Sequence, residues 1–288
     1  TNYTGDRIPN VDYAHRDANA FKRFLIDVQG YREGNIIDLR DATQAQMTAA
    51  FGNDRTHEGT LWQYVRADES DVTVFYSGHG VPGLKSRRGY LLPVNADPNK
   101  PEINGYPVDT LYANLAKLGA RSVTVYLDAC FSGDSPKGML IEATSGITVT
   151  PVLPKNSVNM VILTAASGTQ FASWDKKAEH GLFTEHLLTA LYGAADAPRY
   201  GKVDGTVTAG EVEKYLKRHM TYAAKRTYGR IQDATVKGSP ETVLVAFGDT
   251  PPKRPRGPAT QTASLTPPTF EVEEIDETYA ALKVANVR

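Results

Sequence analysis

Two short runs of β-branched and aromatic residues constrain this fold more than any other feature of the sequence. Residues 71–76 (DVTVFY) and 122–127 (SVTVYL) are nearly unbroken apolar runs, and each leads into a loop of small residues. Such runs are typical of strands buried on both faces of a parallel sheet. Segments of helix type alternate with them, so the sequence predicts an α/β fold with a mainly parallel sheet.

The remaining elements follow from apolar periodicity and from capping residues. We expect helices at 17–29, 43–51, 108–118, 182–192 and 208–224, and further strands at 35–39, 159–165 and 241–247. Gly30 is expected to cap the first helix. Residues 1–248 then form one domain, residues 249–270 form an extended linker rich in Pro and Thr, and residues 271–288 form a short tail.

Composition excludes several classes of function. The 32 Lys and Arg residues balance 33 Asp and Glu residues, for a net charge of −1, which favours neither nucleic acid nor an anionic membrane as a partner. No apolar run approaches the roughly 18 residues that a membrane-spanning helix needs. The chain holds one cysteine, so it cannot form an intramolecular disulfide.

The loops after the two apolar runs carry the reactive side chains. Ser77-Gly78-His79-Gly80 follows the first run, and Asp128-Ala129-Cys130 follows the second. Ligands bind beyond the carboxyl ends of parallel strands, so neighbouring strands would bring His79 and Cys130 to one rim. A thiol beside a base is the arrangement of nucleophilic catalysis. The alternatives are a buried core thiol at Cys130 and a simple turn residue at His79.

These two motifs, residues 76–80 (YSGHG) and 127–133 (LDACFSG), resemble the catalytic pair of caspase-like cysteine peptidases in their bacterial metacaspase or orthocaspase branch. The resemblance covers residues 1–248. Its other motifs are 8–10 (IPN) with 16–18 (RDA), 89–93 (GYLLP), 163–167 (LTAAS) with Gln170, and 180–184 (HGLFT). It implies a three-layer sandwich with helices on both faces of the sheet.

The same resemblance implies roles for the motif residues. Cys130 would attack the scissile carbonyl, His79 would serve as its base, and the backbone N–H groups of Gly80 and Cys130 would form the oxyanion hole. We expect His79 to lower the thiol pKa from its ordinary value of about 8.5. Spacing identifies no third catalytic residue.

Substrate specificity can be argued from charge. A carboxylate at Asp128, two residues before the nucleophile, would repel an acidic substrate side chain and pair with Arg or Lys. By resemblance, Asp17 is the second wall of this pocket and Ser77 lies close by. Asp128 could instead bind loop amides, and Asp17 could simply favour its own helix N-terminus. Ser167, Gln170 and Trp174 either line substrate subsites or pack in the core.

Several further features carry weaker expectations. The other histidines have no partner pattern and are assigned surface or core roles: His15, His57, His180, His186 and His219. A basic-specific peptidase could cut itself at Lys137 or Lys155, between its two halves. Calcium activates many relatives of this kind, but the candidate acidic residues are scattered, so no metal ligand is assigned: Asp97, Glu102, Asp109 and Asp134.

The resemblance also bears on the ends of the chain. The family's first strand would lie before Thr1, and residues 279–288 resemble the opening strand of a bacterial Src-homology-like domain. We expect a monomer that acts on proteins or peptides with basic residues, in the bacterial cytoplasm or envelope. Two rivals stay open: a catalytically silent caspase-like interaction module, and a flavodoxin-like small-molecule binder, although no Gly-rich phosphate loop follows an early strand.

Overall fold

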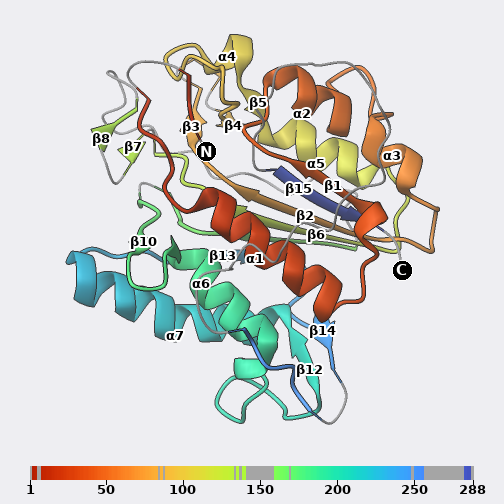
Figure 1. The fold of residues 1–288 in the computed structure, drawn as a ribbon, viewed down its shortest axis with the longest axis vertical. Helices are drawn as coiled ribbons and strands as arrows, with labels where there is room; N and C mark the ends of the chain where they lie inside the picture. The colour runs from red at the N-terminus through yellow and green to blue at the C-terminus, as the bar shows by residue number, and fades with distance from the viewer. Residues whose placement is uncertain are drawn as a thin grey trace, which may run out of the picture.

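A six-stranded mixed sheet forms the centre of the protein (Figure 1). The computed structural model describes residues 2–4, 8–83, 85–86, 88–132, 134–135, 138–140, 159–168, 170–247, 250–255 and 282–286, the backbone alone for 134–135, 138–139 and 282–286. The strand order is β1-β15-β2-β6-β9-β13. The strands are β1 (Ile36–Leu39), β2 (Asp71–Ser77), β6 (Ser122–Asp128), β9 (Met160–Thr164), β13 (Thr235–Lys237) and β15 (Leu282–Asn286).

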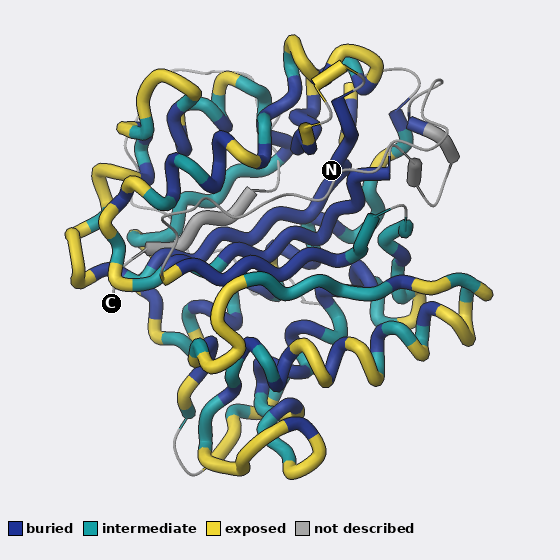
Figure 2. Tube along the Cα trace, turned by 180° about the vertical axis from the view of Figure 1, so that it is seen from behind, coloured by how far each residue is buried: buried dark blue, intermediate teal, exposed yellow. Residues whose placement is uncertain are grey.

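The apolar runs lie in the middle of this sheet, as their composition predicts. β2 pairs with β6 in parallel, and β6 pairs with β9 in parallel. Alternate side chains point to opposite faces: Phe75 and Tyr126 belong to one core, whereas Val74 and Val125 belong to the other. In Figure 2 the buried backbone of these strands runs between exposed outer segments. The predicted strands 71–76 and 122–127 are confirmed.

Helices cover both faces. The core that includes Phe75 is closed by α1 (Ala14–Asp27), α6 (Leu182–Thr189) and α7 (Ala209–Tyr228). The core that includes Val74 is closed by α2 (Gln44–Phe51), α3 (Thr60–Tyr64) and α5 (Val108–Ala116). Figure 1 shows the two groups on opposite sides of the sheet. A π-helical turn, Ala190–Ala194, continues α6, and α4 (Pro101–Asn104) lies beside the small sheet that follows β2.

Capping residues fix the helix ends. Thr43 and Thr208 each form a capping box, with Gln46 and Glu211 respectively, at the starts of α2 and α7. Gly30, with φ of +71°, follows α1, and the Tyr31 amide donates to the Leu25 carbonyl at 2.9 Å. This bond satisfies one of the last carbonyls of α1, so the predicted glycine cap is confirmed.

Short antiparallel strand pairs complete the structure. The pairs are β3 (Gly80–Pro82) with β4 (Gly89–Leu91), β4 with β5 (Tyr106–Pro107), β7 (Asp134–Ser135) with β8 (Gly138–Met139), β10 (Trp174–Asp175) with β11 (His180–Gly181), and β12 (Thr206–Thr208) with β14 (Val243–Ala246). The strand predicted at 241–247 is therefore β14, and it pairs with β12 outside the central sheet. Within the described residues, no helix combines the length and the apolarity needed to cross a bilayer.

The chain's last described segment lies inside the central sheet. β15 pairs antiparallel with β1 on one side and with β2 on the other, so that Val284 stands opposite both Ile37 and Val74. The predicted tail thus contributes a strand in this structure. Most of the predicted linker lies outside the described residues, and the proposed domain boundaries stay predictions.

A proline at position 284 tests this placement. Val284→Pro removes a backbone N–H from a strand with partners on both sides, which should cost at least about 1 kcal/mol of unfolding free energy. For a domain of this size that corresponds to a fall in Tm of about 2–4 °C per kcal/mol. Val284→Thr keeps the N–H and should melt close to wild type. Equal Tm values for the two variants would mean that β15 does not hold this position.

Candidate active site

The register between β2 and β6 places the two reactive loops side by side. Ser77 stands opposite Asp128, and the Gly78 amide donates to the Asp128 carbonyl at 3.2 Å. His79 and Cys130 each follow this paired position by two residues. Because the strands are parallel, both loops leave from the same edge of the sheet.

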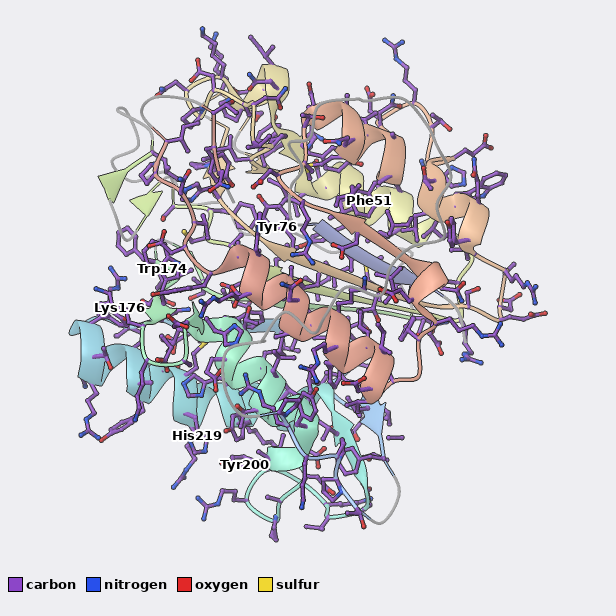
Figure 3. All side chains as sticks on the ribbon, viewed as in Figure 1. Phe51, Tyr76, Trp174, Lys176, Tyr200 and His219 are labelled. Carbon is purple, nitrogen blue, oxygen red and sulfur yellow. The ribbon has the colours of Figure 1, made fainter. Side chains whose placement is uncertain are left out.

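One cavity of about 360 Å³, open to solvent, is lined by side chains from both loops. Its lining residues with polar or aromatic side chains are Asp17, Ser77, His79, Asp128, Cys130 and Trp174, and the others are Val11, Gly78, Ala172 and Gly181. Trp174 makes an edge contact with Tyr13 at 6.4 Å between ring centroids. Figure 3 shows Trp174, one of the lining residues, beyond the N-terminal end of α1.

A backbone carbonyl orients the His79 imidazole. Nε2 of His79 lies 2.6 Å from the carbonyl oxygen of Pro9. A carbonyl can only accept, so Nε2 carries the hydrogen and Nδ1 is the basic nitrogen of the neutral ring. The partner that orients His79 is thus a main-chain atom of the first loop, which a search for side chains could not find.

Two tyrosines hold the backbone at His79. Tyr3 accepts the His79 amide hydrogen at 2.8 Å, and its ring lies 4.8 Å from the imidazole centroid. Tyr76 donates to the His79 carbonyl at 2.8 Å, an oxygen that also accepts from the Leu92 amide. Gly78 lies between these hydroxyls: a Cβ there would be 2.5 Å from the Tyr76 oxygen. Only glycine fits at this position without moving them.

Cys130 is 5 % exposed, and its environment differs from the expectation. Burial raises the pKa of its thiol, and the nearby Asp128 carboxylate acts in the same direction. Hydrogen bonds with the Ala172 backbone and Ser132 oppose this but do not reverse it. The expected lowering of the thiol pKa by His79 is therefore wrong for the resting protein. Burial therefore disfavours a thiolate at Cys130 in the resting protein.

Asp17 lies in the first turn of α1 but does not serve that helix. It is 1 % exposed, and it accepts hydrogen bonds from Ser77 Oγ (3.2 Å), the Gly181 amide (3.1 Å) and His180 Nδ1 (2.7 Å). These donors belong to β2 and β11, so Asp17 ties three elements together at the cavity. Burial raises its pKa, and the bond from His180 works against that rise.

Two alternatives stood open for Asp128, a carboxylate in the pocket or a group that binds backbone amides, and the structure shows contacts of both kinds. Its Oδ2 accepts from the hydroxyl of Thr184 at 2.6 Å and from the Thr184 amide at 3.3 Å, in the first turn of α6. It also lines the cavity. Burial, then the neighbouring Asp17 carboxylate, raises the pKa of Asp128 to about 7. One carboxyl of the pair therefore holds a proton near neutral pH.

Gly181 lets the two carboxylates approach each other. A Cβ at Gly181 would clash with Oδ2 of Asp128 and would lie 3.1 Å from Oδ2 of Asp17. The two acids thus converge on the backbone at one glycine, at the floor of the cavity. Sequence reasoning predicted both acids as the pocket walls but gave no role to Thr184 or His180. The motif HGLFT (180–184) contains both, and that motif was the available signal.

His180 is buried, in agreement with a core position, and its bond to Asp17 gives it a partner that the sequence did not indicate. Ser167 and Gln170 lie outside the cavity: Gln170 donates to the Asp233 carboxylate at 3.1 Å and accepts the Asp233 amide at 2.6 Å. Their role as subsite residues stays a prediction. Gly80 packs against the nucleophile loop, where a Cβ would lie 2.6 Å from the Cys130 carbonyl oxygen. Lys137 and Lys155 lie outside the described residues.

The scattered acids have separate partners. Asp109 pairs with Arg88, Asp97 pairs with Lys100, and Glu102 accepts from the Lys85 amide. In the part of the chain that the structure describes, no three His, Cys, Asp or Glu side chains gather as a metal site would require. The calcium expectation stays untested.

The buried acid at position 128 should make stability depend on pH. Its pKa of about 7 in the folded protein exceeds the ordinary value of about 3.9, so unfolding releases a proton between these values. The free energy of unfolding should therefore fall as pH rises from 4 to 7. In Asp128→Asn, this pH-dependent fall in the free energy of unfolding should be smaller by a few kcal/mol. Melting curves at pH 5 and pH 8 measure it, with the exposed Asp54→Asn as the control; an unchanged loss in Asp128→Asn would contradict the assignment.

The raised thiol pKa predicts how Cys130 reacts. Its alkylation by iodoacetamide should accelerate about tenfold per pH unit from pH 6 to at least 8.5, because the thiolate is the nucleophile. Intact-mass measurement reports this residue alone, since the chain has one cysteine. A rate that levels off below pH 7 would reveal a standing thiolate and refute the prediction.

Comparisons with known proteins identify the fold and the family. The crystal structure of caspase-1 from Spodoptera frugiperda is similar with a TM-score of 0.56 and 11 % identity, over 86 % of this chain and 87 % of that one. At this identity the likeness establishes the fold alone, and the predicted caspase-like α/β sandwich is confirmed. No curated protein matches the chain. The family model described as "Caspase domain" matches residues 1–217, well over half of the sequence, and the chain therefore belongs to the caspase domain family of cysteine-type peptidases.

Proposed function

We propose that the protein is a cysteine endopeptidase that cleaves after Arg or Lys, with Cys130 as nucleophile and His79 as base. The observation that carries the specificity is the pair of buried carboxylates, Asp17 and Asp128, in the cavity that also holds Cys130 and His79. A pocket with two acids and no described lysine or arginine in its lining suits a cationic side chain. A protease domain implies protein substrates, and these would present a basic residue before the scissile bond.

The chemistry follows from the atoms in place. As the Cys130 sulfur attacks the scissile carbonyl, Nδ1 of His79 takes the thiol proton while the Pro9 carbonyl holds Nε2–H. The same proton passes to the leaving amine, and water then hydrolyses the thioester. The N–H groups of Gly80 and Cys130 are the proposed donors to the oxyanion, where one donor is worth about a hundred- to a thousandfold in rate.

The substrate side chain would meet both acids at the cavity floor. Ser77 and the Gly181 amide hold the Asp17 carboxylate, and Thr184 holds that of Asp128. Their positions are thus fixed before substrate arrives, which lowers the cost of binding. An acidic side chain would face two carboxyl groups with no counterion from the substrate, which costs several kcal/mol.

Fluorogenic peptides ending in Arg, Lys or Asp test the proposal. We expect turnover of the Arg and Lys peptides only. Cys130→Ala should lower kcat/KM by at least about a thousandfold. Asp128→Asn should lower it at least tenfold for the basic peptides, because a buried charge pair loses one partner. The surface variant Asp54→Asn should match wild type.

Two results would contradict the proposal in different ways. Faster cleavage of the Asp peptide would overturn the basic specificity and leave the peptidase standing. No turnover of any peptide by folded protein would favour the catalytically silent interaction module. Several further properties are proposals from the resemblance alone. They are placement in the metacaspase or orthocaspase branch, self-cleavage at Lys137 or Lys155, calcium activation, a monomeric state, and a location in the bacterial cytoplasm or envelope. A denaturing gel of the same reactions, with and without chelator, tests self-cleavage and calcium together.

A further inference from the structure

His180 stands directly behind the proposed substrate pocket. It belongs to β11, opposite Asp175 of β10, and its side chain is 7 % exposed. Its Nδ1 lies 2.7 Å from Oδ1 of Asp17, and the residue is not part of the cavity lining. It can therefore influence a substrate only through the two pocket acids.

The two carboxylates of the pocket need more positive charge than one basic substrate side chain supplies. Asp17 and Asp128 are 1 % and 6 % exposed, and both converge on Gly181. Two carboxylates this close and this dry cannot both ionise without opposite charge nearby. A guanidinium or an ammonium group supplies one positive charge. A second positive charge is needed before both acids can be ionised beside it.

We propose that His180 is a positioning residue whose imidazolium supplies this second positive charge, so that Asp17 and Asp128 are both ionised around the substrate's basic group. This inference rests on the proposed function. His180 holds Asp17 as a carboxylate in the free protein, and the proton of the pair stays on Asp128. Binding of Arg or Lys expels that proton, which leaves two carboxylates and two cations in the buried site.

The groups around Asp128 support this assignment. Asp17 faces it from α1, His180 acts on it from β11, and His79 and Cys130 line the same cavity from the loops after β2 and β6. Thr184 of α6, which bonds Asp128, is neutral. The Nδ1 of His180 bonds Asp17 from behind, and an imidazolium there would lower the pKa of Asp128 while the Asp17 charge raises it.

The consequence is a pH-dependent affinity for basic peptides. Below the pKa of Asp128, about 7, affinity should rise tenfold per pH unit, because binding releases one proton. Above that pH it should level off. Without the imidazolium, the pair of Asp17 and Asp128 loses its last proton at a higher pH. The affinity for basic peptides should then keep rising to that higher pH. A histidine that only donates a hydrogen bond to Asp17 would produce no such shift, since glutamine can also donate.

Calorimetric titration of full-length Cys130→Ala protein, which cannot turn over its ligand, measures this directly. The probes are an acetylated tetrapeptide ending in arginine amide and its citrulline counterpart, which has nearly the same shape and no charge. We expect the Kd of the Arg peptide to fall about tenfold per unit from pH 5.5 to 7 and then level. Adding His180→Gln should extend this fall to at least pH 8. The citrulline peptide should show no such dependence in either protein, and the ratio of the two Kd values removes any pH effect that both peptides share.

Proton counts give an independent readout. Titrations at pH 8 in two buffers of different ionisation enthalpy should show little proton release for Cys130→Ala and at least half a proton for Cys130→Ala with His180→Gln. Asp17→Asn removes the second carboxylate, so adding His180→Gln to it should shift the pH profile much less than in the protein with both acids. His180→Asn, which also donates a hydrogen bond without a charge, repeats the test if His180→Gln fails to fold.

Three outcomes would overturn the inference. Coincident pH profiles with and without His180→Gln would show that its charge is not used. An equal effect on the Arg and citrulline peptides would show a structural role only. If the Arg peptide binds none of these proteins, the proposed pocket for basic side chains is wrong. If wild type still cleaves basic peptides while either of the first two results is found, the inference about His180 fails and the proposed function stands.

Discussion

The parallel pairing of β2 with β6, with Ser77 opposite Asp128, is the constraint on which the site depends. Both loops leave the sheet at the same edge, so one strand pair supplies the proposed base, the proposed nucleophile and one acid of the proposed pocket. A slip of one residue would turn every side chain of a strand to the other face. The two cores prevent this, because Phe75 and Tyr126 are buried on one face while Val74 and Val125 are buried on the other.

The buried polar groups of the site lower the stability of the fold. Two acids and a thiol are all buried at one edge of the sheet, and burial raises the pKa of each. Hydrogen bonds from Ser77, Gly181 and Thr184 offset part of the desolvation cost. Natural active sites commonly carry such local destabilisation, which the surrounding core must compensate. The rigid centre of the sheet provides that compensation.

Local chemistry explains how much of this the sequence could predict. The apolar runs, their small-residue loops, His79, Cys130 and the acid beside the nucleophile all follow from short motifs. The bond from His180 to Asp17 joins residues 163 positions apart, and the one from Pro9 to His79 spans 70, so no local pattern reveals either. The thiol pKa was predicted in the wrong direction because burial, a property of the whole fold, outweighs the expected influence of one neighbour. The pairing of β15 with β1 and β2 is likewise a tertiary outcome.

The acceptor that aligns the imidazole is the main-chain oxygen of Pro9. Every residue type has such an oxygen, so a scan of side-chain replacements would pass over this partner and a comparison of aligned residues would not record it. What must be preserved is the path of the chain through residues 8–10, which the neighbouring bond from the Tyr3 amide to Asn10 helps to define. Competence for proton transfer is in that sense a property of loop shape rather than of residue identity.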